Sequence, residues 1–345
     1  MSGTEAEVAT KAPESDAQEH APTTADAPAA AADAAATEEP APPKMGENCH
    51  TDRPTPSGQG PTGEIRKLND IDVYVSKPSE YPHAPARLLL LLTGGTGLKS
   101  INNQIQADKF AAEGYVVVMP DLFEGDVAPN STTVDADQAA EGSTGSFLDN
   151  FKIKAVETAK SFMIDMWLAR HTEEKVLPIL HKVIDGAKDE FADAVSNGGG
   201  IYAVGYCFGG KYILLLAAER RPVAGGGGFF GEAEKPPADE EAGAAKNGPF
   251  IKAGALAHAT LVAREDFEGI KVPLSLVCVE NDPLFPDDVR KFGEDALSKA
   301  NLEHEVQVYP GVPHGFAVVG DYEDVTIKEA QSTAHEQLVK WLKDH

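Results

Sequence analysis

The chain has 345 residues, and its 55 acidic and 30 basic side chains give a net charge of −25. This length suits one large α/β domain with a sizeable core. The acidic excess disfavours nucleic acid and anionic membranes as partners, and no apolar run in the sequence is long enough to span a bilayer.

Residues 1–46 are rich in alanine, proline and acidic residues and contain no aromatic residue. Such a segment cannot bury enough apolar surface to offset the entropy lost on ordering, so we predict a disordered tail followed by one domain over residues 47–345. The tail contains no hydrophobic signal core. Cys49, Cys207 and Cys278 form no close-spaced pair, which favours a reducing compartment and predicts neither a disulfide framework nor a zinc site. We therefore expect a cytoplasmic protein.

Strands and helices alternate along the domain, which favours an α/β fold with a mostly parallel sheet and helices on both faces. The first half predicts strands over residues 71–75, 88–92 and 115–119 and a helix over 102–113. The second half predicts helices over 151–170 and 173–197, strands over 201–204, near 253, over 274–279 and 305–308, and an amphipathic helix through 327–341. The glycine-rich stretch 225–248 breaks this alternation, so we predict a flexible surface insertion there.

The loop Thr93-Gly94-Gly95-Thr96-Gly97 follows a predicted strand and resembles the opening of a nicotinamide-binding Rossmann unit. The third glycine of that fingerprint is absent, and the chain contains no Tyr-x-x-x-Lys pair. The strand before the loop is also not expected to be the first in its sheet. A reductase is therefore an alternative that the sequence favours little.

The segment Gly205-Tyr206-Cys207-Phe208-Gly209-Gly210 joins a predicted strand to a predicted helix. Small residues two positions before and after Cys207 are typical of a nucleophile elbow, in which the chain turns so sharply that only glycine-sized neighbours fit. A thiol at the N-terminus of a helix is acidified by the backbone dipole, and the thiolate is the attacking species. We predict that Cys207 is a nucleophile, the alternative being a cysteine buried beside a tight turn.

An elbow nucleophile needs a base and an acid that orients the base, in the chain order nucleophile, acid, histidine. Asp282 follows the predicted strand 274–279, and His314 follows the predicted strand 305–308. Loops beyond the carboxyl ends of parallel strands are where such sheets place their sites, so we predict that Asp282 and His314 complete a triad with Cys207. His258, which also follows a predicted strand, is the main rival for the base, and Asp282 has the alternative of capping a turn.

From about Cys49 to Trp341 the chain resembles the dienelactone hydrolase family of α/β-hydrolases, particularly its fungal members. The matching segments are 61–64, 110–126, 205–210, 280–282 and 314–316. The resemblance implies an α/β-hydrolase fold and a Cys-His-Asp triad of Cys207, His314 and Asp282. That triad would act on small ester or lactone substrates with no cofactor. The expected oxyanion donors are the backbone N–H of Phe208 and, by the resemblance, that of Gly95.

Two positions depart from the family's bacterial members. Those members carry a glutamate in the loop after the early strand, where this chain has Gly94, and an arginine soon after the histidine, where this chain has Ala317-Val318-Val319-Gly320. The arginine binds a substrate carboxylate, so its absence favours a neutral ester or lactone over dienelactone itself. A non-catalytic binding protein on the same scaffold is the alternative that the missing acidic residue at Gly94 and the insertion at 225–248 leave open.

Overall fold

The computed structural model describes residues 51–129, 162–219 and 248–345. The predicted tail, Cys49, the first part of the helix expected at 151–170 and nearly all of the predicted insertion lie outside these residues. The part of that helix that is described, residues 162–170, is helical.

The described residues form an eight-stranded sheet in the order β1-β2-β4-β3-β5-β6-β7-β8. β2 is antiparallel to β1 and to β4, and all other neighbours run parallel, as predicted. The strands are β1 (Glu64–Leu68), β2 (Ile71–Ser76), β3 (Arg87–Leu92), β4 (Tyr115–Pro120), β5 (Ile201–Tyr206), β6 (Ala253–Ala257), β7 (Leu274–Val279) and β8 (His304–Tyr309). The strand before the glycine-rich loop is β3, which confirms that it is not the first strand and weakens the reductase alternative further.

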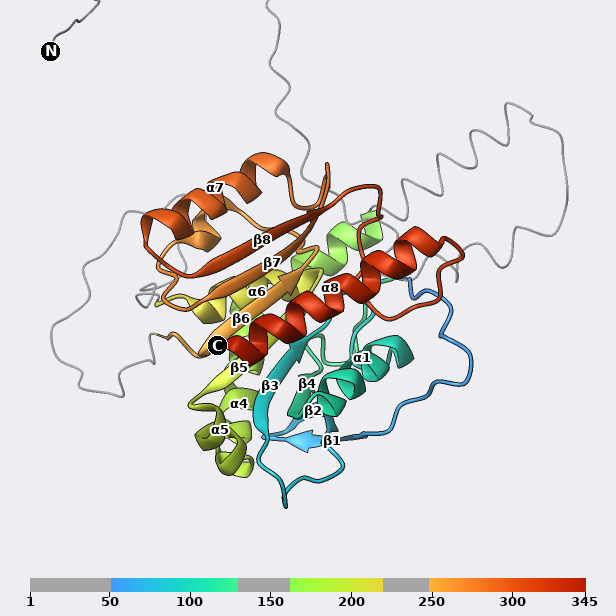
Figure 1. Ribbon diagram of the computed structural model, residues 1–345, viewed down its shortest axis with the longest axis vertical. Coiled ribbons are helices and arrows are strands. Elements are labelled where there is room, and N and C mark those ends of the chain that lie inside the picture. The colour runs from blue at the N-terminus through green and yellow to red at the C-terminus, as the bar shows by residue number, and fades with distance from the viewer. Residues whose placement is uncertain (1–50, 130–161, 220–247) are drawn as a thin grey trace, which may run out of the picture. The chain divides into compact units, whose positions relative to one another are not determined.

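The helices are α1 (Ile101–Ala112), α4 (Glu173–Glu190), α5 (Ala192–Gly198), α6 (Phe208–Ala217), α7 (Asp287–Lys299) and α8 (Val325–Asp344). Helices α1 and α8 lie on one face of the sheet and α4, α5 and α6 on the other (Figure 1). Within this part of the chain no helix has both the length and the apolar character needed to cross a membrane.

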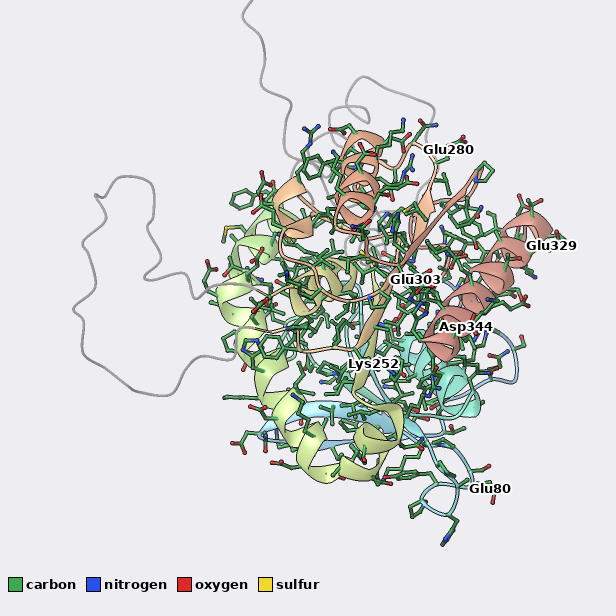
Figure 2. All side chains as sticks on the ribbon, turned by 60° about the vertical axis from the view of Figure 1, so that its left-hand side comes forward. Glu80, Lys252, Glu280, Glu303, Glu329 and Asp344 are labelled. Atoms are coloured by element: carbon green, nitrogen blue, oxygen red, sulfur yellow. The ribbon has the colours of Figure 1, made fainter. Side chains whose placement is uncertain are left out.

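Alternation along the central strands divides the core between the two faces. In β3, Leu88, Leu90 and Leu92 pack toward α4 and α6, whereas Leu89 and Leu91 pack toward α1 and α8. A strand buried on both faces is a continuous apolar run, which is the pattern that identified β3 in the sequence. Charged side chains such as Glu280, Glu329 and Asp344 remain exposed (Figure 2).

Two elements differ from the sequence-based expectation. The edge strand β1 was not predicted, because four of its five side chains are at least partly exposed and it carries no apolar pattern. The single helix expected over 173–197 is divided at Phe191, whose φ of −113° and ψ of 40° leave the helical region. No glycine or proline marks that break.

Candidate active site

Cys207 lies in the turn between β5 and α6, with a φ of 50° and a ψ of −117°. A non-glycine residue with positive φ is strained, and such strain concentrates at functional sites. A Cβ on Gly205 would lie 2.5 Å from the carbonyl oxygen of Gly209, and one on Gly209 would clash with the carbonyl oxygen of Leu92. The two glycines are therefore needed for the turn, as the sequence pattern predicted.

The backbone around Cys207 is held by the neighbouring strand. The Cys207 N–H donates to the Ala257 carbonyl at 3.1 Å, and the Thr260 N–H donates to the Cys207 carbonyl at 3.1 Å. Because Cys207 is the N-cap residue of α6, its thiol lies at the positive end of the helix dipole, which favours the thiolate. The residue is 3% exposed.

His314 and Asp282 meet in the loops after β8 and β7. Nδ1 of His314 lies 2.6 Å from Oδ2 of Asp282, and the Leu284 N–H donates to Oδ1 of the same carboxylate at 2.9 Å. Asp282 is 3% exposed. Because the carboxylate bonds to Nδ1, Nε2 is left on the side of Thr260 and Cys207. A general base in a triad requires this orientation.

Thr260 connects this pair to the thiol. Its Oγ1 lies 3.2 Å from Sγ of Cys207 and 3.2 Å from Nε2 of His314. Thr260 was not predicted as a site residue. Thr260 lies in the loop after β6, and β6 is the neighbour of β5, the strand that precedes Cys207. This place after a neighbouring strand was the only feature of the sequence that could have indicated Thr260.

His258 is not placed to act as the base. It lies in the same loop as Thr260, and its ring centroid is 5.0 Å from that of His314, but neither of its nitrogens makes a hydrogen bond. Asp282 and Thr260 both bond to His314, so the geometry separates the two candidates that the sequence left open.

The pKa of His314 is raised to about 9. Burial alone would lower it, but the hydrogen bond to Asp282 and the interaction with Cys207 outweigh burial, and the charges of both partners add to the increase. The imidazolium is therefore favoured while a thiolate lies beside it.

This shift predicts how stability depends on pH. The pKa of His314 is raised on folding above its ordinary value of 6.5, so its contribution to the free energy of unfolding is complete below about pH 6.5 and is lost as pH rises through about 9. Denaturant unfolding of the wild type and of His314→Gln at several pH values checks this. The difference in unfolding free energy between the two proteins should shrink from about pH 6 to about pH 9.5. If this difference grows over the same pH range, the raised pKa of His314 is contradicted.

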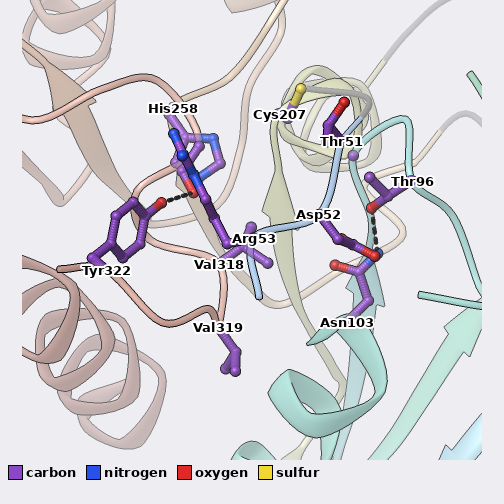
Figure 3. Close-up of a pocket in the computed structure, with 12 residues that line it drawn as sticks. Thr51, Asp52, Arg53, Thr96, Asn103, Cys207, His258, Val318, Val319 and Tyr322 are labelled. Carbon is purple, nitrogen blue, oxygen red and sulfur yellow. Dashed lines mark hydrogen bonds between the residues drawn. The ribbon is translucent and has the colours of Figure 1, made fainter. Parts of the chain in front are cut away.

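A cavity beside Cys207 is lined by the glycine-rich loop, by the segment before β1 and by residues near His314 (Figure 3). Its empty space, which includes open solvent at the mouth, is about 420 Å³. Gly94 and Thr96 line the cavity. The backbone carbonyl of Gly95 accepts a hydrogen bond from Ala128. The oxyanion role of the N–H groups of Gly95 and Phe208 stays a prediction.

Arg53 brings a cation into this cavity that the sequence did not reveal. Its guanidinium lies over the ring of Tyr322, 5.1 Å from the centroid. The segment is held by hydrogen bonds from the Asn102 side chain to the Arg53 carbonyl at 2.7 Å and from the Asp321 N–H to the Pro54 carbonyl at 2.8 Å. The expectation of a neutral substrate rested on a missing arginine after His314, and Arg53 offers a cation from a different part of the chain.

The other thiol in the described residues has a different environment. Cys278 lies inside β7 and is 1% exposed, and burial raises the pKa of its thiol to about 12. The described residues contain no group of three His, Cys, Asp or Glu side chains placed to hold a metal ion.

Comparison with known proteins agrees with this architecture. The model of the dienelactone hydrolase family matches residues 71–345. Hydrolase pyvD of Aspergillus violaceofuscus is 28% identical, over 82% of this chain and 90% of its own length, and hydrolase tropI of Talaromyces stipitatus is 28% identical, over 83% and 91%. The crystal structure of a putative dienelactone hydrolase from Klebsiella pneumoniae is similar in fold, with a TM-score of 0.55 at 16% identity, over 82% of this chain and 99% of that one.

Proposed function

The chain belongs to the dienelactone hydrolase family and is a hydrolase of ester bonds, and on that premise we propose that Cys207, His314 and Asp282 form its catalytic triad. The substrates that we propose are small esters or lactones. The observation that carries the proposal is the chain of contacts from Cys207 through Thr260 and His314 to Asp282, which begins at a strained residue on a helix N-terminus.

In the proposed reaction, Sγ of Cys207 attacks the carbonyl carbon of the ester. The proton of the thiol resides on Nε2 of His314, and Asp282 stabilises the imidazolium through Nδ1. The tetrahedral oxyanion is held by the N–H of Phe208 and that of Gly95, where one such donor lowers the barrier by about 3 kcal/mol. His314 then protonates the leaving oxygen, and a thioester forms on Cys207.

Water cleaves the thioester in the second half of the reaction. Neutral His314 takes a proton from the water as it attacks and keeps that proton as the thiolate of Cys207 departs, so the enzyme ends in its starting state, with an imidazolium beside a thiolate. Every step uses side chains of this chain and water, so the proposal includes no cofactor. A nucleophilic thiol has to be kept reduced, which supports the cytoplasm as the compartment.

The direct test is the hydrolysis of p-nitrophenyl butyrate under rapid mixing. Acylation that is faster than deacylation should release an initial burst of p-nitrophenol that is proportional to the enzyme concentration. If the protein hydrolyses neither p-nitrophenyl esters nor simple lactones, the alternative of a non-catalytic binding protein replaces this proposal.

Thr260 supplies a second test, because its hydroxyl contacts both Cys207 and His314. Thr260→Val keeps the size of the side chain and removes the hydroxyl, and hydrogen bonds to charged groups contribute about 1.5–3 kcal/mol. We therefore expect kcat/KM for p-nitrophenyl butyrate to fall by about 10- to 100-fold. The rate at which iodoacetamide alkylates Cys207 near neutral pH should also fall, because the thiolate loses a donor.

Thr260→Ser is the matched control, since it keeps the hydroxyl and loses a methyl group. It should retain kcat/KM within about 5-fold of the wild type. If the valine variant equals the wild type in both measurements, the hydroxyl has no role in the proposed reaction.

A further inference from the structure

His258 is a fully buried histidine with no hydrogen-bonding partner for its ring. Its side chain is 0% exposed, and within the described parts of the chain neither Nδ1 nor Nε2 makes a hydrogen bond. The backbone is held in place, because the His258 N–H donates to the Val277 carbonyl at 2.7 Å. Buried polar groups almost always have partners, so an unpartnered imidazole calls for an explanation.

The ring is neutral. Burial lowers the pKa of His258 well below its usual value, and the positive charge of His314 lowers it further. The backbone carbonyl of His258 opposes the shift but does not reach hydrogen-bonding geometry with either nitrogen. A neutral imidazole carries one N–H donor and one lone-pair acceptor. The fold therefore buries one donor and one acceptor that no described residue satisfies.

The unpartnered ring borders the proposed reaction space. His258 lines the same cavity as Cys207, and Figure 3 draws it on the side of Arg53 and Tyr322, across the cavity from Thr96 and Asn103. The rest of its surroundings is aromatic, with the ring centroids of Tyr206 and Phe316 at 5.9 Å and 6.1 Å. A bound substrate would place a polar group beside Cys207, and that group could serve as the hydrogen-bonding partner of the His258 ring.

Resting on the proposed function, we propose that His258 binds the acyl part of the substrate, through a hydrogen bond to a hydroxyl group on that part. The preferred esters or lactones are then hydroxy-substituted. A hydroxyl both donates and accepts, so it pairs with the imidazole in either tautomer. An alkyl chain would leave both ring nitrogens without a hydrogen bond. A carboxylate carries only acceptors, so it could bond to the N–H of the ring but not to its lone pair.

A matched pair of esters tests the proposal. The ratio of kcat/KM for p-nitrophenyl 3-hydroxybutyrate to that for p-nitrophenyl butyrate is measured in the wild type and in His258→Phe, which keeps an aromatic ring and removes both nitrogens. We expect the wild type to prefer the hydroxy ester by at least about 10-fold, because a site built to bind a hydroxyl rejects the analogue that lacks it. In the phenylalanine variant the ratio should fall to about one, with hydrolysis of the butyrate retained.

Two more variants keep the test decisive if His258→Phe does not fold. His258→Asn and His258→Gln place a polar atom near the positions of Nδ1 and Nε2, respectively, and the preference should survive in at least one of them. A wild-type ratio near one, with both esters hydrolysed, overturns the proposal, because the substrate hydroxyl then gains nothing from His258, and it leaves the proposed function standing. Equal losses on both esters in His258→Phe overturn it too. Hydrolysis of neither ester by the wild type rejects the proposed function itself.

Discussion

Cys207→Ala should lose hydrolysis of p-nitrophenyl butyrate almost completely, with kcat lowered by about 10⁴-fold or more. The reason is that alanine has no nucleophile, and losing one member of a catalytic triad removes nearly all that the triad contributes. The residue already has a φ of 50° and is 3% exposed, so the substitution removes one sulfur atom without new backbone strain. Steady-state kinetics together with thermal unfolding checks both parts of the prediction.

Cys278→Ala is the matched control for this prediction. It also removes a buried thiol from the described residues, but Cys278 lies inside β7, and its pKa is raised by burial rather than tuned beside a base. Its activity should stay close to that of the wild type, even where its thermal stability falls. Full activity in Cys207→Ala would reject Cys207 as the nucleophile.

His314→Gln should lower kcat by about 10³- to 10⁴-fold. Glutamine keeps a polar side chain of similar length, but it does not exchange protons, and so it cannot serve either half of the proposed reaction. Asp282 would then be left without the imidazole that it contacts at 2.6 Å. Single-turnover experiments should show that both acylation and deacylation are slowed.

The control for His314→Gln is the same change at His304, in β8. His304 bonds to the Leu302 carbonyl at 2.7 Å and does not line the cavity that contains Cys207, so His304→Gln should keep the wild-type rate. If His314→Gln slows deacylation alone, the thiolate forms without this histidine, and the assignment of His314 as the acceptor of the thiol proton is wrong.

Much of the architecture, and the gathering of Cys207, Asp282 and His314 in one place, could be predicted from sequence, because both depend on simple patterns. Apolar runs such as 88–92 identify strands that are buried on both faces, and the paired glycines around Cys207 mark a turn that only glycine permits. The rule that parallel strands place loops at one edge of the sheet then relates Asp282 and His314 to Cys207. Their contact at 2.6 Å is what this rule leads one to expect.

The remaining site residues depend on three-dimensional details that local patterns do not encode. Thr260 contacts Cys207 because β6 lies beside β5 in a particular register, and that register is set by the whole sheet. Arg53 reaches the cavity from an irregular segment whose path depends on hydrogen bonds to Asn102 and Asp321. The contacts that distinguish His314 from His258 depend on the positions of Asp282 and Thr260.

The most direct test of the central claim is to find the acyl group on the enzyme. The protein is mixed with p-nitrophenyl butyrate, quenched with acid within the burst, and analysed by intact and peptide mass spectrometry. We predict one butyryl group on the peptide that contains Cys207, and none in Cys207→Ala. Turnover with no acyl group on the protein, or with the acyl group on another residue, would contradict a thioester on Cys207.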